Sequence, residues 1–192
     1  MIRAAVFDIG GVLEIVDDDA WQDLWTARWE TSPGAIRASE YHGPTEADFR
    51  ARIAPHVSDV DAAIADFWDT YCGSLDVARR DFVASLKPAG LIVAALSNSG
   101  DGARREEQRR YGFEDLFDLM VYSHEVGVEK PDPAIYALTA ARLGVQPHEI
   151  VFLDDRQAAV DGAVAAGWHA VLHESTPTSI AAVRAVIAAP PH

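Results

Sequence analysis

The sequence predicts an α/β protein, with a parallel sheet that carries helices on both faces and a helical segment inserted after the first strand. From about residue 91 onward, short apolar runs typical of buried parallel strands alternate with amphipathic segments of helical spacing. One further apolar run opens the chain, and the residues between it and the alternating part show helical periodicity alone. Strands separated by helices form right-handed βαβ units, which build a parallel sheet covered on both faces.

The first strand is expected at residues 2–7, an apolar run that ends at Asp8. Gly10 and Gly11 follow, and a strand that runs into a glycine pair is typical of a tight turn. The mostly acidic stretch Glu14–Asp19 is expected to be the hinge into the inserted segment.

The insert is expected to be helical over residues 17–81. Two groups of aromatic and apolar residues recur at helical spacing: Trp21, Trp25 and Trp29, and then Ile64, Phe67, Trp68 and Tyr71. Gly43 and Pro44 interrupt the pattern, and Thr45 with Asp48 three residues later predicts a capping box at the start of the next helix. We interpret the tryptophans as core of the insert, or as a contact between two copies of it, in preference to a stacking platform for a ligand.

The second half supplies the remaining strands and helices of the core. The expected strands are Leu91–Leu96, Leu119–Tyr122, Ile150–Leu153 and Ala170–Leu172. The expected helices are Gly102–Arg110, Pro133–Leu143, Ala158–Ala166 and Thr178–Ala188. The expected division is therefore a core of residues 1–15 and 82–192, with residues 16–81 as the helical insert.

Composition limits the classes of partner. The 192 residues include 16 basic and 30 acidic side chains, a formal net charge of −14. Nucleic acids and anionic membranes bind basic surfaces, so neither is an expected partner. The single cysteine, Cys72, excludes an intramolecular disulfide and suits a cytoplasmic location. No stretch approaches the roughly 18 consecutive apolar residues of a membrane-spanning helix.

Polar side chains follow three of the expected strands. They are Asp8, the pair Ser97 and Asn98, and the pair Asp154 and Asp155. In a parallel sheet these positions share the carboxyl edge, where ligands bind. Carboxylates gathered there repel one another unless a cation lies between them, and Mg²⁺ prefers oxygen ligands. Any one of these residues alone also suits a helix N-cap, but their coincidence at strand ends favours a magnesium site.

The expected chemistry is phosphoryl transfer. Asp8 is placed to attack phosphorus and form an aspartyl-phosphate. The expected metal ligands are Asp8, the carbonyl of Gly10 and Asp154. Asp155 is expected either to bind the metal directly or to contact the groups that do. Lys130 precedes a predicted helix, and it would contribute positive charge to the phosphate oxygens and keep Asp8 ionised. Ser97 would donate a hydrogen bond to the same oxygens.

These residues resemble the four motifs of the haloacid dehalogenase superfamily, and the chain is similar to its small phosphatases with a helical cap after the first motif. The resemblance lies in segments 7–13 (FDIGGVL), 96–98 (LSN), 129–136 (EKPDPAIY) and 152–155 (FLDD), with Gly162 and Gly167 downstream. The motifs occur in order over essentially the whole chain. The resemblance implies a Rossmann-like core, a bound Mg²⁺ and catalysis by Asp8 and Lys130. It also implies phosphate contacts from Ser97, Asn98, Gly11 and Lys130.

One position departs from the family pattern. Most phosphatases of this superfamily have a second Asp two residues after the nucleophile, which protonates the leaving group, whereas this chain has Gly10. Phosphatases similar to sugar-1-phosphatases share this Gly, so another acid or a good leaving group would suffice. Metal-independent 2-haloacid dehalogenases also lack this Asp, but they usually have Ser-Asn in place of Asp154 and Asp155. A third interpretation, a non-catalytic relative that binds metal or phosphate, leaves Lys130 without a role. We therefore expect a phosphatase.

The inserted cap is expected to close over the site and to select the leaving group. The cap residues that are candidates for substrate contact or for the missing acid are His42, Arg37, Arg50 and Arg52. A histidine could donate a proton near neutral pH, although an exposed loop residue is the more common interpretation of His42. The stretch from Gly43 to Phe49 resembles the sugar-phosphatase branch, so a small phosphorylated metabolite, such as a sugar phosphate, is the expected substrate. A monomer and a homodimer both remain open.

Overall fold

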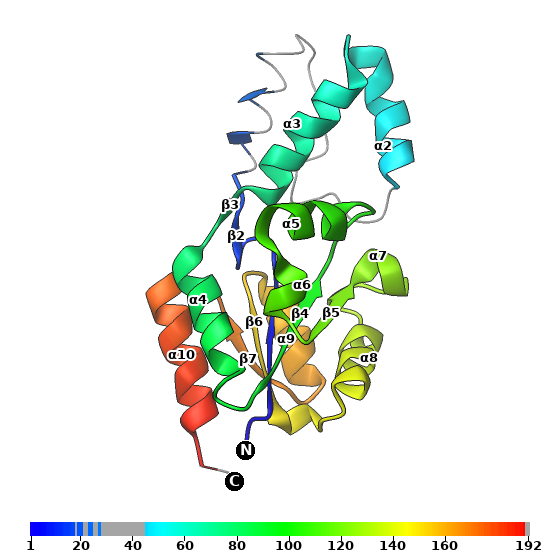
Figure 1. The fold of residues 1–192 in the computed structure, drawn as a ribbon. Helices are drawn as coiled ribbons and strands as arrows, with labels where there is room; N and C mark the ends of the chain where they lie inside the picture. The colour runs from blue at the N-terminus through cyan, green and yellow to red at the C-terminus, as the bar shows by residue number, and fades with distance from the viewer. Residues whose placement is uncertain (18, 21–22, 25–26, 28–44, 191–192) are drawn as a thin grey trace.

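The computed structural model describes residues 1–17, 19–20, 23–24, 27 and 45–190. Its central sheet has the strand order β5-β4-β1-β6-β7, and all neighbouring strands are parallel (Figure 1). The strands are β1 (Ala4–Phe7), β4 (Ile92–Ser97), β5 (Leu119–Tyr122), β6 (Ile150–Asp154) and β7 (His169–Leu172). The predicted α/β fold is confirmed.

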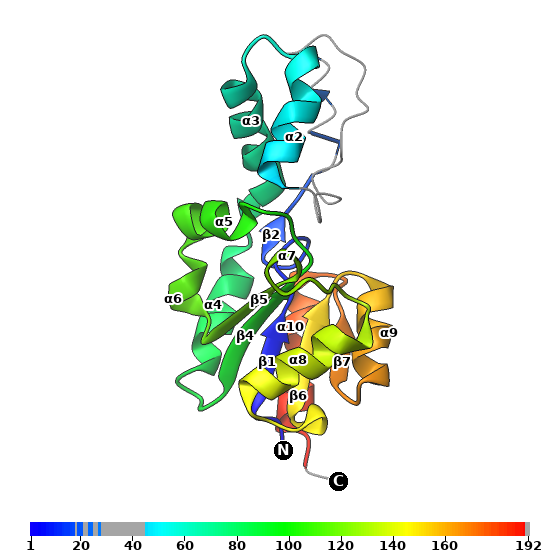
Figure 2. The ribbon, with the colours of Figure 1, turned by 90° about the vertical axis from the view of Figure 1, so that its right-hand side faces the viewer.

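Helices cover both faces of the sheet (Figures 1 and 2). One face carries α4 (Val77–Leu86) and α10 (Thr176–Ala188), and the other carries α8 (Pro133–Leu143) and α9 (Gln157–Ala165). Three further helices are α5 (Ala103–Tyr111), α6 (Phe113–Leu116) and α7 (Ser123–Val126), and single 3₁₀ turns occupy Ala54–His56 and Pro147–Glu149.

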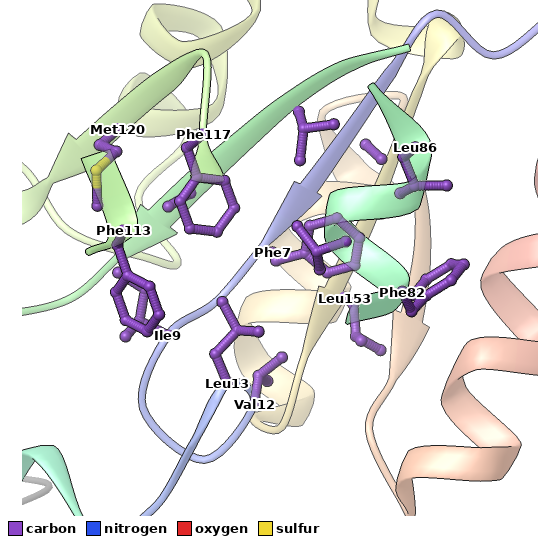
Figure 3. Close-up of a cluster of buried hydrophobic side chains, with 14 of the residues drawn as sticks. Phe7, Ile9, Val12, Leu13, Phe82, Leu86, Phe113, Phe117, Met120 and Leu153 are labelled. Carbon is purple, nitrogen blue, oxygen red and sulfur yellow. The ribbon is translucent and has the colours of Figure 1, made fainter. Parts of the chain in front are cut away.

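The core is divided by the sheet into two apolar clusters, because successive side chains of a strand point to opposite faces. In β1, Ala5 and Phe7 join the cluster under α4 and α10, part of which Figure 3 shows, whereas Ala4 and Val6 join the cluster under α8 and α9. All of β1 is fully buried, as expected of a central parallel strand. The central position of β1 places the residue that follows it, Asp8, in the middle of the carboxyl edge.

The described part of the insert consists of α2 (Glu46–Ile53) and α3 (Val60–Cys72). The predicted capping box is confirmed, because the Asp48 amide donates to Thr45 Oγ1 and the Thr45 amide donates to the Asp48 carboxylate. The predicted apolar face of α3 is buried and packs with Phe49 in a third cluster. The helices of the insert therefore have a core of their own.

Two short strands, β2 (Glu14–Ile15) and β3 (Ser74–Leu75), pair antiparallel where the chain enters and leaves the insert. They were not expected, because two residues are too few to show a periodicity. At Gly73 the backbone has φ +54°, and a Cβ there would lie 2.1 Å from the carbonyl oxygen of Ile15. This close approach requires glycine, and it ends the helical block at Cys72 instead of at the expected residue 81.

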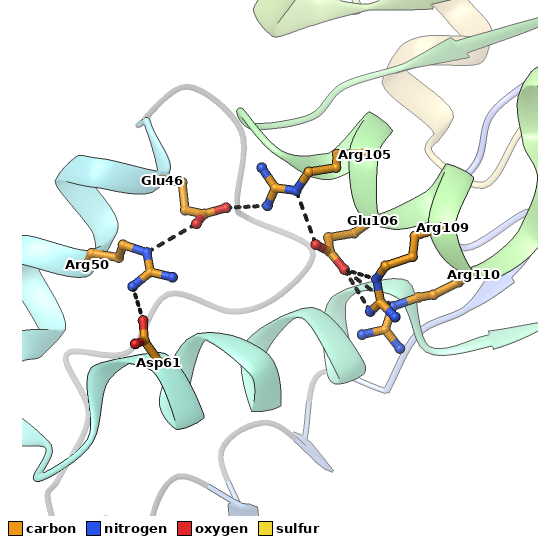
Figure 4. A network of polar contacts seen from close by, with 7 residues as sticks. All are labelled: Glu46, Arg50, Asp61, Arg105, Glu106, Arg109 and Arg110. Atoms are coloured by element: carbon orange, nitrogen blue, oxygen red, sulfur yellow. Dashed lines mark hydrogen bonds and ion pairs between the residues drawn. The ribbon is translucent and has the colours of Figure 1, made fainter.

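Ion pairs connect the insert to the core (Figure 4). The Glu46 carboxylate of α2 accepts hydrogen bonds from Arg50 on the same helix (3.1 Å) and from Arg105 of α5 (2.6 Å). Arg110, also on α5, pairs with Asp69 of α3. Both described helices of the insert are therefore linked to α5 by charged contacts near the surface.

The expected boundary at residue 81 lies inside α4. Phe82 and Leu86 of this helix pack against the sheet, so α4 lies with the core. The division into a core and a cap stays a prediction.

Trp21, Trp25 and Trp29 lie outside the described residues. Among the residues that are described, no helix is both long and apolar enough to cross a membrane.

Candidate active site

The carboxyl edge of the sheet gathers most of the predicted site residues around one pocket. Phe7 of β1 is in register with Ala95 of β4 and Leu153 of β6, so the ends of these three strands lie side by side. The predicted residues that line the pocket are Asp8, Gly10, Gly11, Ser97, Asn98, Lys130 and Asp155. Asp154 is fully buried behind it.

Lys130 lies between the two central carboxylates. Its Nζ is 2.9 Å from Asp8 Oδ1 and 2.6 Å from Asp154 Oδ2, and it also donates to the carbonyl of Leu96 at 2.8 Å. Burial lowers the pKa of Lys130, but the charges of Asp8 and Asp154 outweigh this effect and raise it. The lysine is therefore a fixed positive charge beside Asp8.

Asn98 holds the segment that carries this lysine. Its amide nitrogen donates to the Lys130 carbonyl and its amide oxygen accepts from the Lys130 N–H, each at 2.8 Å. Both polar groups of the Asn98 side chain thus contact the Lys130 backbone, and a phosphate contact from Asn98 stays a prediction. Ser97 is 3% exposed and lines the pocket.

Asp8 and its acidic neighbours carry more negative charge than one lysine neutralises. Burial raises the pKa of Asp8 well above its ordinary value and the Asp154 charge raises it further, whereas Lys130 lowers it. Burial, followed by the Asp154 charge, also raises the pKa of Asp155. Lys130 therefore lowers the pKa of Asp8, as expected, but burial and the neighbouring carboxylates raise this pKa by more.

The three aspartates could hold a metal ion. Asp8, Asp154 and Asp155 each place one carboxylate oxygen within 4.8 Å of the others. Asp154 is held in place, because its Oδ1 accepts from the Arg156 N–H at 2.8 Å while its Oδ2 accepts from Lys130. Oxygen ligands in a cluster with excess negative charge fit a hard divalent cation such as Mg²⁺.

The glycine turn after β1 brings the backbone close to this cluster. Gly11 has φ +73°, and a Cβ there would lie 2.2 Å from Asp155 Oδ2. A Cβ at Gly10 would meet no atom within 4 Å. Gly11 is thus required both by its backbone conformation and by the approach of Asp155, whereas the side-chain position of residue 10 is open.

Sequence reasoning missed other residues at the pocket, among them Glu14, Tyr71 and Arg156. Glu14 was expected only to be part of the acidic hinge into the insert, and it is 1% exposed. The available signal was its position shortly after Asp8 in the sequence. Of the cap residues considered for substrate contact, the two that are described, Arg50 and Arg52, do not line this pocket. Arg50 pairs with Glu46 and Asp61, and Arg52 lies over the ring of Phe49. His42 and Arg37 lie outside the described residues.

Comparison with known proteins agrees with this geometry. The family model of haloacid dehalogenase-like hydrolases matches residues 2–167. The phosphoserine phosphatase of Thermus thermophilus is 32% identical over 165 residues, which cover 82% of this chain and 65% of that protein. The (S)-2-haloacid dehalogenase 1 of a Pseudomonas species is 32% identical over 135 residues, which cover 56% of this chain and 60% of that protein. The chain thus spans less than two thirds of each of these relatives.

Among solved structures, a haloacid dehalogenase family enzyme from Bacteroides thetaiotaomicron, described as a magnesium complex, superposes with a TM-score of 0.77 at 22% identity. The match covers 90% of this chain and 93% of that one. At this identity the likeness establishes the fold, and the family model establishes the membership. The chain belongs to the haloacid dehalogenase-like hydrolases.

Proposed function

We propose that this hydrolase cleaves phosphomonoesters of small metabolites in a magnesium-dependent reaction, with Asp8 as the nucleophile. The observation that carries the proposal is the gathering of Asp8, Asp154 and Asp155 around a single lysine, Lys130, at the edge of the sheet. Without a bound cation, the negative charge of this cluster would repel an anionic substrate. With a bound cation, the cluster suits a phosphoryl group.

The residues that would hold Mg²⁺ are Asp8, Asp154, Asp155 and the carbonyl of Gly10. The bound ion would supply positive charge to the phosphoryl oxygens and to the nucleophile. The magnesium complex described for the structural neighbour supports this choice of metal.

The chain's own residues supply the remaining roles. Asp8 is held for attack, because its Oδ1 accepts from the Ile9 N–H at 2.8 Å and from Lys130. Lys130 would bind a phosphate oxygen and stabilise the ionised form of Asp8. Ser97 would donate to another phosphate oxygen. The Gly11 N–H, expected to contact phosphate, instead donates to the Glu14 carbonyl at 2.9 Å. The pocket has a volume of about 160 Å³, which suits a phosphate on a small leaving group.

A 2-haloacid dehalogenase is the second candidate, supported by the dehalogenase relative. Its chemistry places a carboxylate nucleophile in the same position but needs no cation. The acidic pair Asp154 and Asp155 argues against it, because a metal-free site would leave three carboxylates with Lys130 as their neutralising partner.

The test is a hydrolysis assay on a panel of phosphorylated metabolites that includes phosphoserine and sugar phosphates, with Mg²⁺ and with a chelator. We expect phosphate release that requires Mg²⁺ and is abolished in Asp8→Asn. Asp81→Asn, which alters an exposed carboxylate of α4, is the matched control and is expected to keep activity. Activity that persists in chelator or in Asp8→Asn would contradict the proposal, and metal-independent halide release from a 2-haloacid would establish the alternative.

A further inference from the structure

Glu14 is a buried acid on the strand that leads from the nucleophile into the insert. Its amide donates to the Ile9 carbonyl at 2.9 Å, and its own carbonyl accepts from the Gly11 N–H at 2.9 Å. These bonds fix Glu14 on the turn that begins at Asp8. In β2 the side chains alternate, so Ile15 is 58% exposed while Glu14 is 1% exposed and lines the pocket together with Asp8.

The carboxyl of Glu14 has no partner within the described part of the chain. Both of its oxygens are buried, and neither makes a hydrogen bond. The nearby cation Arg110 pairs with Asp69 instead, and the nearby acid Glu107 accepts from the hydroxyl of Tyr122. A buried polar group without a partner is costly, so a residue kept only for stability would be expected to have one. The missing partner fits a group that arrives with the substrate.

The charge state of Glu14 follows from its surroundings. Burial raises the pKa of Glu14 well above its ordinary value, and the charges of Glu107 and Asp8 raise it further, whereas Arg110 lowers it. The hydroxyls of Tyr71, Tyr111 and Tyr122 and the thiol of Cys72 also lie near it, and burial raises the pKa of each. An ionised Glu14 would be a buried charge with neither a hydrogen bond nor a paired cation, which is costly, so the neutral carboxyl is favoured.

We propose that Glu14 is the general acid of this site and donates its carboxyl proton to the leaving-group oxygen of the substrate. The inference rests on the proposed phosphatase function, and it identifies the proton donor that Gly10 cannot provide. It assigns the role to a residue that reaches the pocket from β2.

The proton balance of the two steps is complete. In the first step a carboxylate oxygen of Asp8 bonds to phosphorus, the bond from phosphorus to the leaving oxygen breaks, and that oxygen takes the Glu14 proton. The alcohol leaves, and Glu14 is now a carboxylate. In the second step Glu14 takes a proton from water as the water oxygen bonds to phosphorus, and the bond to Asp8 breaks. Inorganic phosphate is released, and both residues return to their initial states.

The test compares a poor with a good leaving group in Glu14→Gln, which keeps the shape of the side chain and removes the acidic proton. General acid catalysis typically contributes about 10²–10⁴-fold. We expect kcat/KM to fall by at least about 10²-fold for an alkyl phosphate, whose alkoxide needs a proton, and by less than about 3-fold for p-nitrophenyl phosphate, whose phenolate does not. Equal losses for the two esters, or no loss for the alkyl phosphate, would overturn the proton-donor role and leave the phosphatase proposal intact.

A rescue experiment separates catalysis from structure. The open space at residue 10 has room for a side chain, so the double variant Gly10→Asp, Glu14→Gln is expected to regain alkyl phosphate hydrolysis. Failure of this rescue in a folded double variant would count against the inference. Glu107→Gln alters a buried acid that does not line the pocket and is expected to affect both esters equally.

The wild-type protein gives an independent measurement should Glu14→Gln fail to fold. Across a series of phosphate esters, kcat/KM is expected to depend only weakly on the pKa of the leaving alcohol or phenol, because the acid compensates for poor leaving groups. A steep dependence would overturn the inference. Absence of hydrolysis of every ester by the wild-type protein would overturn the phosphatase proposal and the inference together.

Discussion

Gly11→Ala would test whether Asp155 belongs to a magnesium site. Two effects are expected from the added methyl group. Gly11 has φ +73°, a conformation that costs an L-residue about 1–2 kcal/mol. The new Cβ would also lie 2.2 Å from Asp155 Oδ2, so the Asp155 carboxylate must swing away from its place beside Asp8. Movement of the backbone is not required, because the clash is with the end of a side chain.

The loss of metal affinity in Gly11→Ala can be measured separately from the backbone strain that the substitution causes. Loss of a carboxylate that binds or orients the ion typically weakens metal affinity about 10–100-fold. At a saturating Mg²⁺ concentration this factor corresponds to about 1.4–2.8 kcal/mol of lost stabilisation, because the ion binds the folded state. Gly127→Ala is the matched control, since Gly127 has the same φ of +73° and its Cβ would meet no atom within 4 Å.

The assay is urea unfolding of the wild type and the two variants, with and without Mg²⁺, together with calorimetric Mg²⁺ titration. Without Mg²⁺ the free energy of unfolding of both variants is expected to be about 1–2 kcal/mol lower than that of the wild type. With Mg²⁺ only Gly11→Ala should lose more, and this extra loss should vanish in an Asp155→Asn background, where the carboxylate is already changed. If Gly11→Ala binds Mg²⁺ as tightly as the wild type, Asp155 does not belong to the metal site.

Three further predictions concern the surroundings of the site. Asn98→Asp replaces the amide that donates to the Lys130 carbonyl by an oxygen that repels it, so kcat/KM for phosphoester hydrolysis should fall on the order of 10²-fold while the melting temperature stays near that of the wild type. Burial raises the pKa of Glu107 from its ordinary 4.5 to about 7, so the folded state binds more protons between these values. The contribution of Glu107 to stability in urea unfolding should therefore be complete below about pH 4.5 and fall by about 3 kcal/mol as pH rises through 7, and this fall should be absent in Glu107→Gln. Arg105→Ala breaks the pair with Glu46, but because the Arg105 side chain is 58% exposed, thermal unfolding should show a loss of no more than about 1 kcal/mol.

Much of the fold could be predicted because its strands and helices show a periodicity in the sequence or end at recognisable residues. The buried strands were visible as apolar runs, and α8 was visible from the helical spacing that ends at Gly144. Asp8 and Asp154 could be placed together because parallel strands end at a common edge. These inferences need only local patterns and one topological rule.

The remaining features depend on contacts between distant residues, which no local pattern reports. β2 and β3 exist because residues 14–15 and 74–75 meet across the insert. The role of Asn98 depends on the Lys130 backbone, 32 residues further along the chain. The acidic stretch that contains Glu14 indicated only a hinge, because this side chain is turned inward by the pairing of β2 with β3.

The most direct test of the central claim is to trap the phosphorylated enzyme. Wild-type protein mixed with a phosphoester substrate and Mg²⁺ should be quenched in acid during turnover, digested and examined by mass spectrometry. We predict one phosphoryl group on the peptide of the first motif, located on Asp8, and none when Mg²⁺ is chelated. Phosphate release without a phosphoryl group on Asp8, or with one on another residue, would contradict the assignment of Asp8 as the nucleophile.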